Sequence, residues 1–416
     1  MNNLTLTRTE AGLGSIRIGT SAYLRSSLAF FAAGFVTFVT LYDVQPLLPE
    51  FSREFGISPA VGSLPLSVAT ATMAITMLLA GTVSETWGRK QVMTGALILT
   101  SLLSLLIAVS ETFSGLVALR FLQGFVLAGL PAVAMAYLSE ELDASAIGSA
   151  MGLYIAGNAV GGMTGRIVTA AMTDIWSWRA ALGVFGVLCL LLSLLFVKSL
   201  PPSHLPRRPF QARYLFTSLG RHLTDPLLLC LYGISFLAMG SFVTLYNYLT
   251  FRLLGDPYAL TQSHVSLIFL VYLLGSLSAS ATGRIIGRFD RTFLLRLSLA
   301  TMAAGALLTL AGSLPLIITG VALFTVGFFG AHSVASSWVG RHAQTAKAQA
   351  SALYLFFYYL GSSVSGTLGG ICWSQGGWNG VTGMIVLLIA MALAVCQGIS
   401  SYQVGKRGVS PAPHNV

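Results

Sequence analysis

The chain has 416 residues and is 55% hydrophobic, with only 9% charged residues and a formal net charge of +10. Soluble globular domains carry about 25% charged residues, so this composition excludes a water-soluble protein and predicts a membrane protein. The positive charge would also suit nucleic acid, but the distribution of the basic residues, described below, disfavours that interpretation.

The apolar runs of the chain predict twelve membrane-spanning helices. Each run is close to the roughly 20 residues that cross a bilayer, and none shows the alternation of barrel strands. The predicted spans cover residues 26–49, 62–82, 91–110, 114–137, 146–173, 180–200, 226–251, 264–284, 292–312, 315–338, 350–373 and 377–400. The loops between them are mostly short, so we expect an all-α membrane protein without a large soluble domain.

The longest interruption separates spans six and seven and divides the chain into two halves. Residues 201–225 begin with two prolines and carry four arginines, so we predict a cytoplasmic linker there. The predicted organisation is a tail at 1–25, a six-helix bundle at 26–200, this linker, a second six-helix bundle at 226–400 and a tail at 401–416.

Three charged residues lie deep inside predicted spans. Asp43 in span one is the only carboxylate that we place within a span, and Arg120 in span four and Arg166 in span five lie at a similar depth. At about 1.5 Å per residue this depth is roughly 10 Å below the outer surface, where an unpaired charge costs a few kcal/mol. We predict that the three form one cluster, which is either part of a pathway for protons or a structural salt bridge. One acid beside two bases also favours a ligand with an acidic group.

The segment after span two combines glycines, an acid and two bases: Gly81, Glu85, Gly88, Arg89 and Lys90. Glycine allows a sharp turn, and Glu85 can neutralise a nearby arginine or the N-terminus of a helix. We therefore predict a tight, charged loop between two helices.

Span five carries small residues at every fourth position, Gly148 with Gly152 and then Gly157, Gly161 and Gly165. Residues four apart share one face of a helix, and small residues there let another helix approach closely. We expect tight packing, and a gating contact between the two halves is a further hypothesis.

Five residues of span one return in span seven, 204 positions later. Residues 38–42 and 242–246 both read Phe-Val-Thr-Leu-Tyr, and further matches keep their order at offsets of 202 and 200, among them Gly161 with Gly361. Six spans separate each residue from its partner, and an even number preserves orientation. We therefore predict two pseudo-symmetric bundles related by an axis along the membrane normal. The seam between such bundles is where transporters bind their cargo.

Six aromatic or polar residues are candidates for the cargo cavity: Tyr42, Tyr246, Asn247, His332, Tyr354 and Tyr358. Apolar pockets with a few polar groups suit organic ligands, although aromatic side chains in membrane helices more often pack or contact lipid. The repeat favours Tyr246 and Asn247, because it places them opposite Tyr42 and Asp43. For His332 we expect a hydrogen-bonded packing role, although it could titrate near neutral pH.

The repeat also pairs two loops of opposite charge. At an offset of 200, Glu141 after span four corresponds to Arg341 after span ten. We hypothesise an electrostatic latch between them that closes the inner side. The alternative is two solvated loops that never meet, and a surface ion pair contributes only about 0–1 kcal/mol in any case.

Basic residues are distributed very unevenly along the chain. With the N-terminus inside, 18 of the 23 lysines and arginines fall in inner loops, tails and adjoining span ends, and three fall in outer loops. This asymmetry predicts that both termini face the cytoplasm. It also makes anionic lipid, rather than nucleic acid, the expected counter-charge.

Three of these segments resemble signatures of the major facilitator superfamily. Residues 81–90 resemble the family's loop Gly-x-Leu-x-Asp-x-x-Gly-Arg-Lys, with Glu85 in place of Asp. Arg120, Gln123 and Gly124 in span four resemble its Arg-x-x-Gln-Gly motif. In this family the loop after span two helps to latch the two halves in the outward-facing state, so the resemblance implies that role for residues 81–90.

The glycines of span five resemble the family's antiporter motif: Gly148, Gly157, Gly161, Gly162 and Gly165. Gly162 stands where that motif has Pro, and Arg166 replaces its final Gly. The likeness covers roughly residues 26–400 and is closest to the drug:proton antiporter and sugar-efflux branch, specifically the YnfM-type bacterial inner-membrane transporters. It implies twelve helices in two bundles that work by alternating access.

We therefore expect a monomeric transporter of the bacterial inner membrane that exports a small organic molecule, such as a drug, sugar or metabolite, in exchange for protons. Proton-coupled uptake of a small organic anion and a transport-inactive sensor with the same fold are the alternatives. The sequence has no Gly-x-x-x-x-Gly-Lys phosphate loop, no recognisable nucleophile with a base and no metal-binding spacing. We therefore expect neither an enzyme nor a cofactor.

Overall fold

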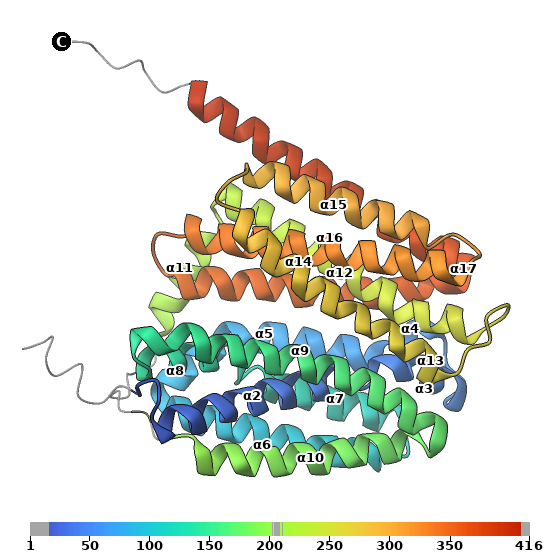
Figure 1. Ribbon diagram of the computed structural model, residues 1–416, viewed down its shortest axis with the longest axis horizontal. Helices are drawn as coiled ribbons and strands as arrows, with labels where there is room; N and C mark the ends of the chain where they lie inside the picture. Colours follow the sequence, from blue (N-terminus) through green and yellow to red (C-terminus); the bar gives the residue numbers. More distant parts are fainter. Residues whose placement is uncertain (1–15, 202, 204–208, 210, 409–416) are drawn as a thin grey trace, which may run out of the picture. The chain divides into compact units, whose positions relative to one another are not determined.

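A computed structural model describes residues 16–201, 203, 209 and 211–408, and nearly all of them lie in helices (Figure 1). The first half of the chain forms α2 (Ser21–Tyr42), η1 (Gln45–Leu47), α3 (Leu48–Glu54), α4 (Pro59–Gly62), α5 (Leu64–Trp87), α6 (Arg89–Ala108), α7 (Phe113–Leu127), α8 (Pro131–Glu141), α9 (Ala144–Ile175) and α10 (Trp178–Ser199). The remainder forms α11 (Ala212–His222), α12 (Pro226–Leu254), α13 (Gln262–Ser266), η2 (Leu267–Val271), α14 (Tyr272–Ile285), α15 (Arg291–Leu308), α16 (Leu314–His342) and α17 (Lys347–Gly408). The predicted helical class is confirmed.

Among the described residues, nine helices or joined helices are long and apolar enough to cross a membrane. The prediction of twelve differs at three places. Predicted span four is broken into α7 and α8, and α9 carries glycines and two charged residues that lower its hydropathy. Predicted spans eleven and twelve are joined in α17, which breaks at Gly377, where φ is 53°. The number twelve therefore remains a prediction.

Prolines mark the places where two predicted spans are interrupted. Pro46 lies in η1, just after α2 ends at Tyr42, and Pro131 is the first residue of α8. Proline has no N–H and clashes with the preceding helical turn, so it is tolerated at the start of a helix and not inside one. The break in span one leaves Asp43 as the C-cap residue of α2.

Contacts divide the chain into two compact units, which are described separately. Unit 1 comprises Met1–Arg213 and Leu253–Phe269, and unit 2 comprises Tyr214–Arg252 and Leu270–Val416. The segment that follows α12 therefore belongs by its contacts to unit 1, although it comes from the second half of the chain.

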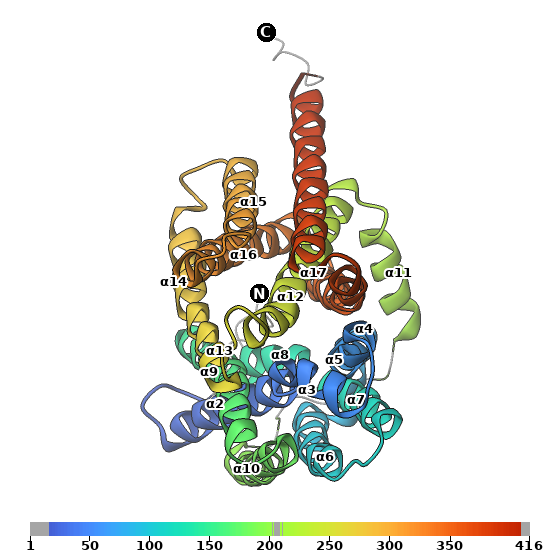
Figure 2. The same cartoon turned by 90° about the vertical axis from the view of Figure 1, so that its right-hand side faces the viewer.

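The core of unit 1 lies between α2, α9 and α10, which pack against one another (Figures 1 and 2). The ring of Phe30 lies 5.5, 6.3 and 6.0 Å from those of Tyr137, Tyr154 and Phe196, and all four residues are buried. Tilted and edge-to-face contacts of this kind add about 0.5–1.5 kcal/mol each beyond burial. They fix the position of α2, the helix that ends at Asp43.

Glycines of α9 let this helix approach α2 closely. A Cβ atom on Gly157 would lie 2.2 Å from the carbonyl oxygen of Phe31, and one on Gly161 would lie 2.3 Å from that of Phe35. Gly165 continues this face against Val39 of α2, whereas Gly148 and Gly152 have nothing within 4 Å of an added Cβ atom, so the tight packing predicted for them is wrong. Both helices belong to unit 1, so the glycines explain packing inside one bundle.

The repeated glycine of the second half makes the same kind of contact. A Cβ atom on Gly361 in α17 would lie 2.1 Å from the carbonyl oxygen of Phe236 in α12. Gly361 is the predicted partner of Gly161, and α12 is the repeat of α2. Unit 2 therefore reproduces, within itself, a helix contact of unit 1.

Replacing Gly161 with alanine is expected to destabilise the protein, because the added methyl group forces α2 and α9 apart. Overpacking of a filled core costs about 1–3 kcal/mol. The matched control is Gly152→Ala in the same helix, where nothing lies within 4 Å of the added atom and alanine favours the helix. Thermal unfolding of both variants in detergent is the measurement, and equal melting temperatures would contradict the close contact.

The predicted linker contains a helix that the sequence pattern did not reveal. α11 buries Leu215, Ser218, Leu219 and His222 on one face. Nε2 of His222 lies 3.1 Å from the carbonyl oxygen of Ala346, which precedes α17. The end of α11 is therefore fastened to unit 2 and is not a free surface loop.

Asp225 begins the second half as the N-cap of α12. Its Oδ1 accepts hydrogen bonds from the backbone N–H groups of Leu227 and Leu228 at 2.9 and 3.0 Å, and its Oδ2 lies 2.8 Å from Nε2 of His342. Burial alone would raise the pKa of this carboxyl group, but these donors outweigh burial and hold the pKa below its usual value. Asp225 therefore ties the start of α12 to the end of α16.

Candidate functional site

Asp43 and Arg120 lie side by side in unit 1. Asp43 follows the last residue of α2, and α7 presents Arg120. Nη1 of Arg120 lies 3.8 Å from Oδ1 of Asp43, and the two residues are only 1% and 2% exposed. The structure therefore brings together two of the three charged residues that lie deep in predicted spans.

Each nitrogen of the Arg120 guanidinium donates a hydrogen bond. Nη1 and Nη2 lie 2.7 Å from the carbonyl oxygens of Thr40 and Leu41, in the last turn of α2, and Nε lies 2.9 Å from that of Pro65, at the start of α5. The final carbonyls of a helix lack N–H partners and form the negative end of its dipole. Arg120 satisfies them and fastens the end of α2 to α5.

Gln123 and Gly124 complete this arrangement. Oε1 of Gln123 accepts from Nη1 of Arg120 at 2.5 Å, and Nε2 of Gln123 donates to Oγ of Ser104 at 2.8 Å. A Cβ atom on Gly124 would lie 2.2 Å from the carbonyl oxygen of Ala69, so glycine is what lets α7 contact α5. One set of contacts thus explains why Arg120, Gln123 and Gly124 occur together at this spacing.

One oxygen of the Asp43 carboxylate has no hydrogen-bond donor. Oδ1 accepts none from the described residues, and the carboxylate borders a small void that is also lined by Val44, Ser104, Ile107 and Leu182. The N–H groups of Arg120 donate to carbonyl oxygens. Arg120 therefore balances the charge of Asp43 without forming a hydrogen bond to Oδ1. A proton can therefore be added at Oδ1 without breaking a hydrogen bond there.

Arg166 has its own set of contacts in unit 1. Its Nε lies 2.6 Å from Oε1 of Gln45, and its Nη1 lies 2.7 Å from the carbonyl oxygen of Gly162. The guanidinium also lies over two rings, 4.1 Å from the centre of Tyr42 and 5.1 Å from that of Phe269, a favourable cation–π geometry. Arg166 thus packs beside the break in span one, next to the residue that precedes Asp43.

The segment after predicted span two is a corner and not a loop. α5 continues to Trp87, and Gly88, with φ of 102°, turns the chain before α6 begins at Arg89. Such a φ is readily adopted only by glycine. Gly81 lies inside α5 with nothing within 4 Å of an added Cβ atom, so the structure assigns it no turn.

Arg89 joins this corner to the end of α8. Its Nε and Nη2 lie 2.8 and 2.5 Å from the two carboxylate oxygens of Glu140, and its Nη1 donates to Oγ of Ser84 at 2.7 Å. Glu85, the predicted neutralising group, lies 3.6 Å away, and its side chain is 42% exposed. Glu140 is therefore the main partner, and no local sequence pattern reveals a pair that is 51 residues apart.

Glu140→Gln is expected to loosen the end of α8, because the Arg89 side chain is only 11% exposed and loses a bidentate partner. Hydrogen bonds to charged groups contribute about 1.5–3 kcal/mol, which predicts roughly tenfold faster hydrogen exchange in α8. The control is Glu85→Gln, which removes a weaker, exposed contact worth about 0–1 kcal/mol. Hydrogen–deuterium exchange measures both, and equal protection of α8 in the two variants would count against this role.

The two residues of the hypothesised inner latch belong to different units. Glu141 is 3% exposed in unit 1, where its Oε1 accepts a hydrogen bond from Oγ of Ser203 at 2.5 Å. Leu200, which lies shortly before Ser203 in the chain, accepts a hydrogen bond from Lys90 at its carbonyl oxygen. Arg341 lies in the last turn of α16 in unit 2. The latch stays a prediction, and Glu141 is held by the first residues of the linker.

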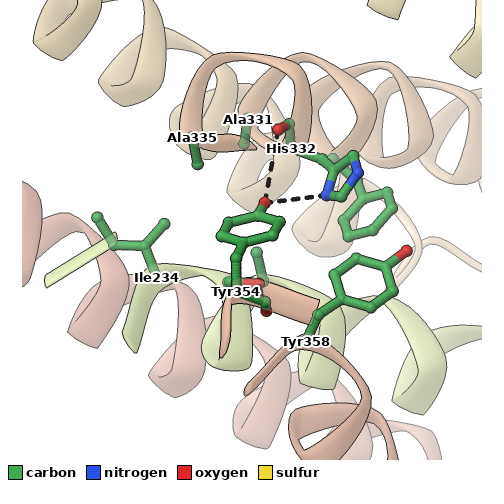
Figure 3. Close-up of a pocket in the computed structure, with 9 residues that line it drawn as sticks. Ile234, Ala331, His332, Ala335, Tyr354 and Tyr358 are labelled. Carbon is green, nitrogen blue, oxygen red and sulfur yellow. Dashed lines mark hydrogen bonds between the residues drawn. The ribbon is translucent and has the colours of Figure 1, made fainter. Parts of the chain in front are cut away.

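Unit 2 contains a pocket that collects three of the predicted cavity residues (Figure 3). Oη of Tyr354 lies 3.0 Å from Nδ1 of His332, and the ring of Tyr358 lies 5.0 Å from the imidazole. α12, α16 and α17 supply the wall residues Ile234, Ser235, Ala238, Phe328, Ala331, His332, Ala335, Tyr354 and Tyr358. His332 is therefore hydrogen-bonded, and it also faces a pocket.

The remaining cavity candidates lie elsewhere. Tyr246 is buried in unit 2, where its Oη lies 2.7 Å from Oγ1 of Thr325 and its ring packs on Tyr272. Asn247 is fully buried, and Tyr42 packs under Arg166 in unit 1. Sequence reasoning missed Phe328, Ser235 and Gln45; the spacing of Phe328 four residues before His332 on one helix face could have revealed the first.

Three comparisons place the chain among known proteins. The model of the Major Facilitator Superfamily matches residues 27–366. The uncharacterized MFS-type transporter YybF of Bacillus subtilis is 49% identical over 379 residues, 91% of this chain and 94% of that protein. The inner membrane transport protein YnfM of Escherichia coli is 46% identical over 381 residues, 91% of each chain. A solved bacterial homologue of the human lysosomal transporter Spinster aligns with a TM-score of 0.74 at 14% identity, over 94% of this chain and 99% of that one, a likeness of fold.

Proposed function

The chain belongs to the major facilitator superfamily, and on this premise we propose that it is a secondary active transporter that works by alternating access. It exports a small organic molecule in exchange for protons and acts as a monomer. It is located in the bacterial inner membrane. The name of the relative YnfM, an inner membrane transport protein, supports this location. Both termini face the cytoplasm, a topology that the asymmetry of basic residues supports.

The buried pair of Asp43 with Arg120 is the observation that carries the proposal. Arg120 holds the last carbonyls of α2 and the first of α5, and Asp43 supplies its counter-charge. Protonation of Asp43 removes that counter-charge and leaves a buried cation without an anionic partner, which is costly. Protonation of Asp43 therefore weakens the contact that Arg120 makes between α2 and α5. This weakening lets the two helices move relative to each other.

The pocket around His332 supports a small organic cargo. Its walls are aliphatic and aromatic side chains with a few polar atoms, which is the usual composition of sites for such molecules. Export is favoured over uptake by the glycines of α9, which resemble the antiporter motif and hold that helix against α2. Uptake of an organic anion uses the same machinery in the opposite sense.

The test is a proteoliposome assay with a pH-sensitive dye trapped inside and a panel of candidate compounds outside. An exchanger releases protons from acidified vesicles when a transported compound is added, and a symporter carries protons in with the compound. Proton release with at least one compound is the expected result. Compound-dependent proton entry would favour uptake, and no compound-dependent proton movement in either direction would overturn the proposal of proton coupling.

A further inference from the structure

The pocket in unit 2 is built from aromatic rings around one imidazole. The ring of Phe328 is stacked on His332 at 6.1 Å, with 17° between the planes, and the ring of Tyr358 lies 5.0 Å from the same imidazole. Figure 3 shows His332, Tyr354 and Tyr358 around this space. A further tilted contact joins Phe328 to Tyr358 at 6.2 Å. The space between these rings is about the size of a water molecule, so a larger ligand enters by taking the place of the half-buried Tyr358 side chain.

The hydrogen bonds of His332 leave one ring nitrogen available. The phenol of Tyr354 lies 3.0 Å from Nδ1, and its distance to the carbonyl oxygen of His332 is longer, at 3.5 Å. We assign the phenol proton to the shorter contact, which makes Nδ1 the acceptor and places the imidazole proton on Nε2. Nε2 bonds to none of the described residues, so it presents a donor to whatever occupies the pocket.

Carboxylates are missing from the membrane spans of this half of the chain. Between residues 226 and 416 the only acidic residues are Asp256 and Asp290, which lie outside the predicted spans. Asp43, in unit 1, is 2% exposed and already faces a guanidinium. A ligand with a fixed positive charge would therefore find no carboxylate partner in this pocket, whereas a ligand oxygen can accept a hydrogen bond from the N–H of His332.

We propose that this pocket binds a planar aromatic molecule that carries no positive charge and offers an oxygen acceptor, as an aromatic carboxylic acid does. The ring of the ligand packs against Phe328, in the space that the Tyr358 side chain now fills, and makes an aromatic contact that a saturated ring cannot make. Its oxygen accepts the Nε2 proton of His332. This inference rests on the proposed transport function, for which the pocket supplies the cargo class.

Calorimetry on the purified full-length protein tests the proposal without any transport. The probes are benzoate, cyclohexanecarboxylate, which lacks the aromatic ring, and benzyltrimethylammonium, which reverses the charge. Benzoate is expected to bind at least about tenfold more tightly than either of the other two. His332→Phe keeps an aromatic wall but loses the donor, and it should weaken benzoate binding about tenfold or more, the effect of a hydrogen bond to a charged group.

His264→Gln is the control, because His264 lies on the exposed side of α13 and outside the pocket. Melting temperatures of the variants show whether each protein remains folded. Phe328→Leu, which removes the ring that the ligand packs on, serves as a second variant that should weaken benzoate and leave cyclohexanecarboxylate unchanged. Equal binding of the three probes, or benzoate binding that survives both pocket substitutions, would overturn the inference. Proton movement driven by a cationic compound would keep the transport function and reject this cargo class.

Discussion

Asp43→Asn is expected to abolish proton-driven transport while cargo still exchanges down its own gradient. The amide has nearly the same shape as the carboxyl group, so the packing at the end of α2 is preserved, but it cannot take up or release a proton. The change fixes the site in a state that resembles the protonated acid. Arg120 keeps its three carbonyl acceptors, so the variant is expected to fold, although the contact between α2 and α5 has lost the support of the ion pair.

Two assays on the same proteoliposomes separate these effects. One applies a pH gradient and follows uphill movement of cargo, and the other follows exchange of labelled for unlabelled cargo at equal pH. Loss of the first signal to background with the second within about twofold of the unchanged protein is the expected pattern. Glu111→Gln, the same chemical change at an exposed acid outside the helices, is the control and should leave both assays unaltered. If uphill transport persisted in Asp43→Asn, the proton would have to travel by another group.

The depth of Asp43 and Arg120 below the outer membrane surface was enough to predict that they lie near each other, because both depths are measured from the same surface. It could not reveal what Arg120 bonds to. The acceptors are backbone carbonyls at the end of α2, and they are available only because the helix stops at Tyr42, ahead of Pro46 in the turn η1. The prediction treated span one as one continuous helix, in which those carbonyls would have been satisfied by N–H groups of the next turn.

Internal repetition predicted which residues correspond, and it could not predict their partners. Gly161 and Gly361 make equivalent contacts, since both depend on backbone geometry that the repeat conserves. Tyr246 and Asn247 are different: they correspond to Tyr42 and Asp43 by position, yet Tyr246 packs on Tyr272 and hydrogen-bonds to Thr325. The cavity residues that converge are instead those of α16 and α17, whose side chains meet through tertiary packing.

Charged pairs at the helix ends show the same limit. The sequence analysis proposed Glu85 as an acid that neutralises a nearby arginine or the N-terminus of a helix, but the closer partner of Arg89 is Glu140. Glu140 comes within reach because α8 restarts at Pro131 and runs on to the corner at Gly88. Local spacing therefore identified the right cation and the right junction, whereas the anion depended on the path of a helix that had been predicted as a straight span.

Replacing Arg120 with methionine is expected to prevent accumulation of folded protein. The substitution leaves carbonyl oxygens of Thr40, Leu41 and Pro65 without a donor in a buried site, and each orphaned group costs about 1–3 kcal/mol. It also leaves Asp43 as a buried charge without its cation, and breaking such a pair costs about 3–5 kcal/mol. The sum is comparable to the whole stability of a typical domain, about 5–15 kcal/mol.

Two companion variants separate the contributions in this sum. Arg120→Lys keeps the charge but cannot reach three carbonyls in different directions with one ammonium group, so an intermediate loss is expected. Arg120→Met combined with Asp43→Asn removes the stranded charge and should recover part of the loss, while the carbonyls stay unsatisfied. Yield of monodisperse protein in size-exclusion chromatography and its melting temperature measure all three. If Arg120→Met alone gave the yield and melting temperature of the unchanged protein, the guanidinium would not be what holds α2 to α5, and the link from proton to helix movement would lose its physical basis.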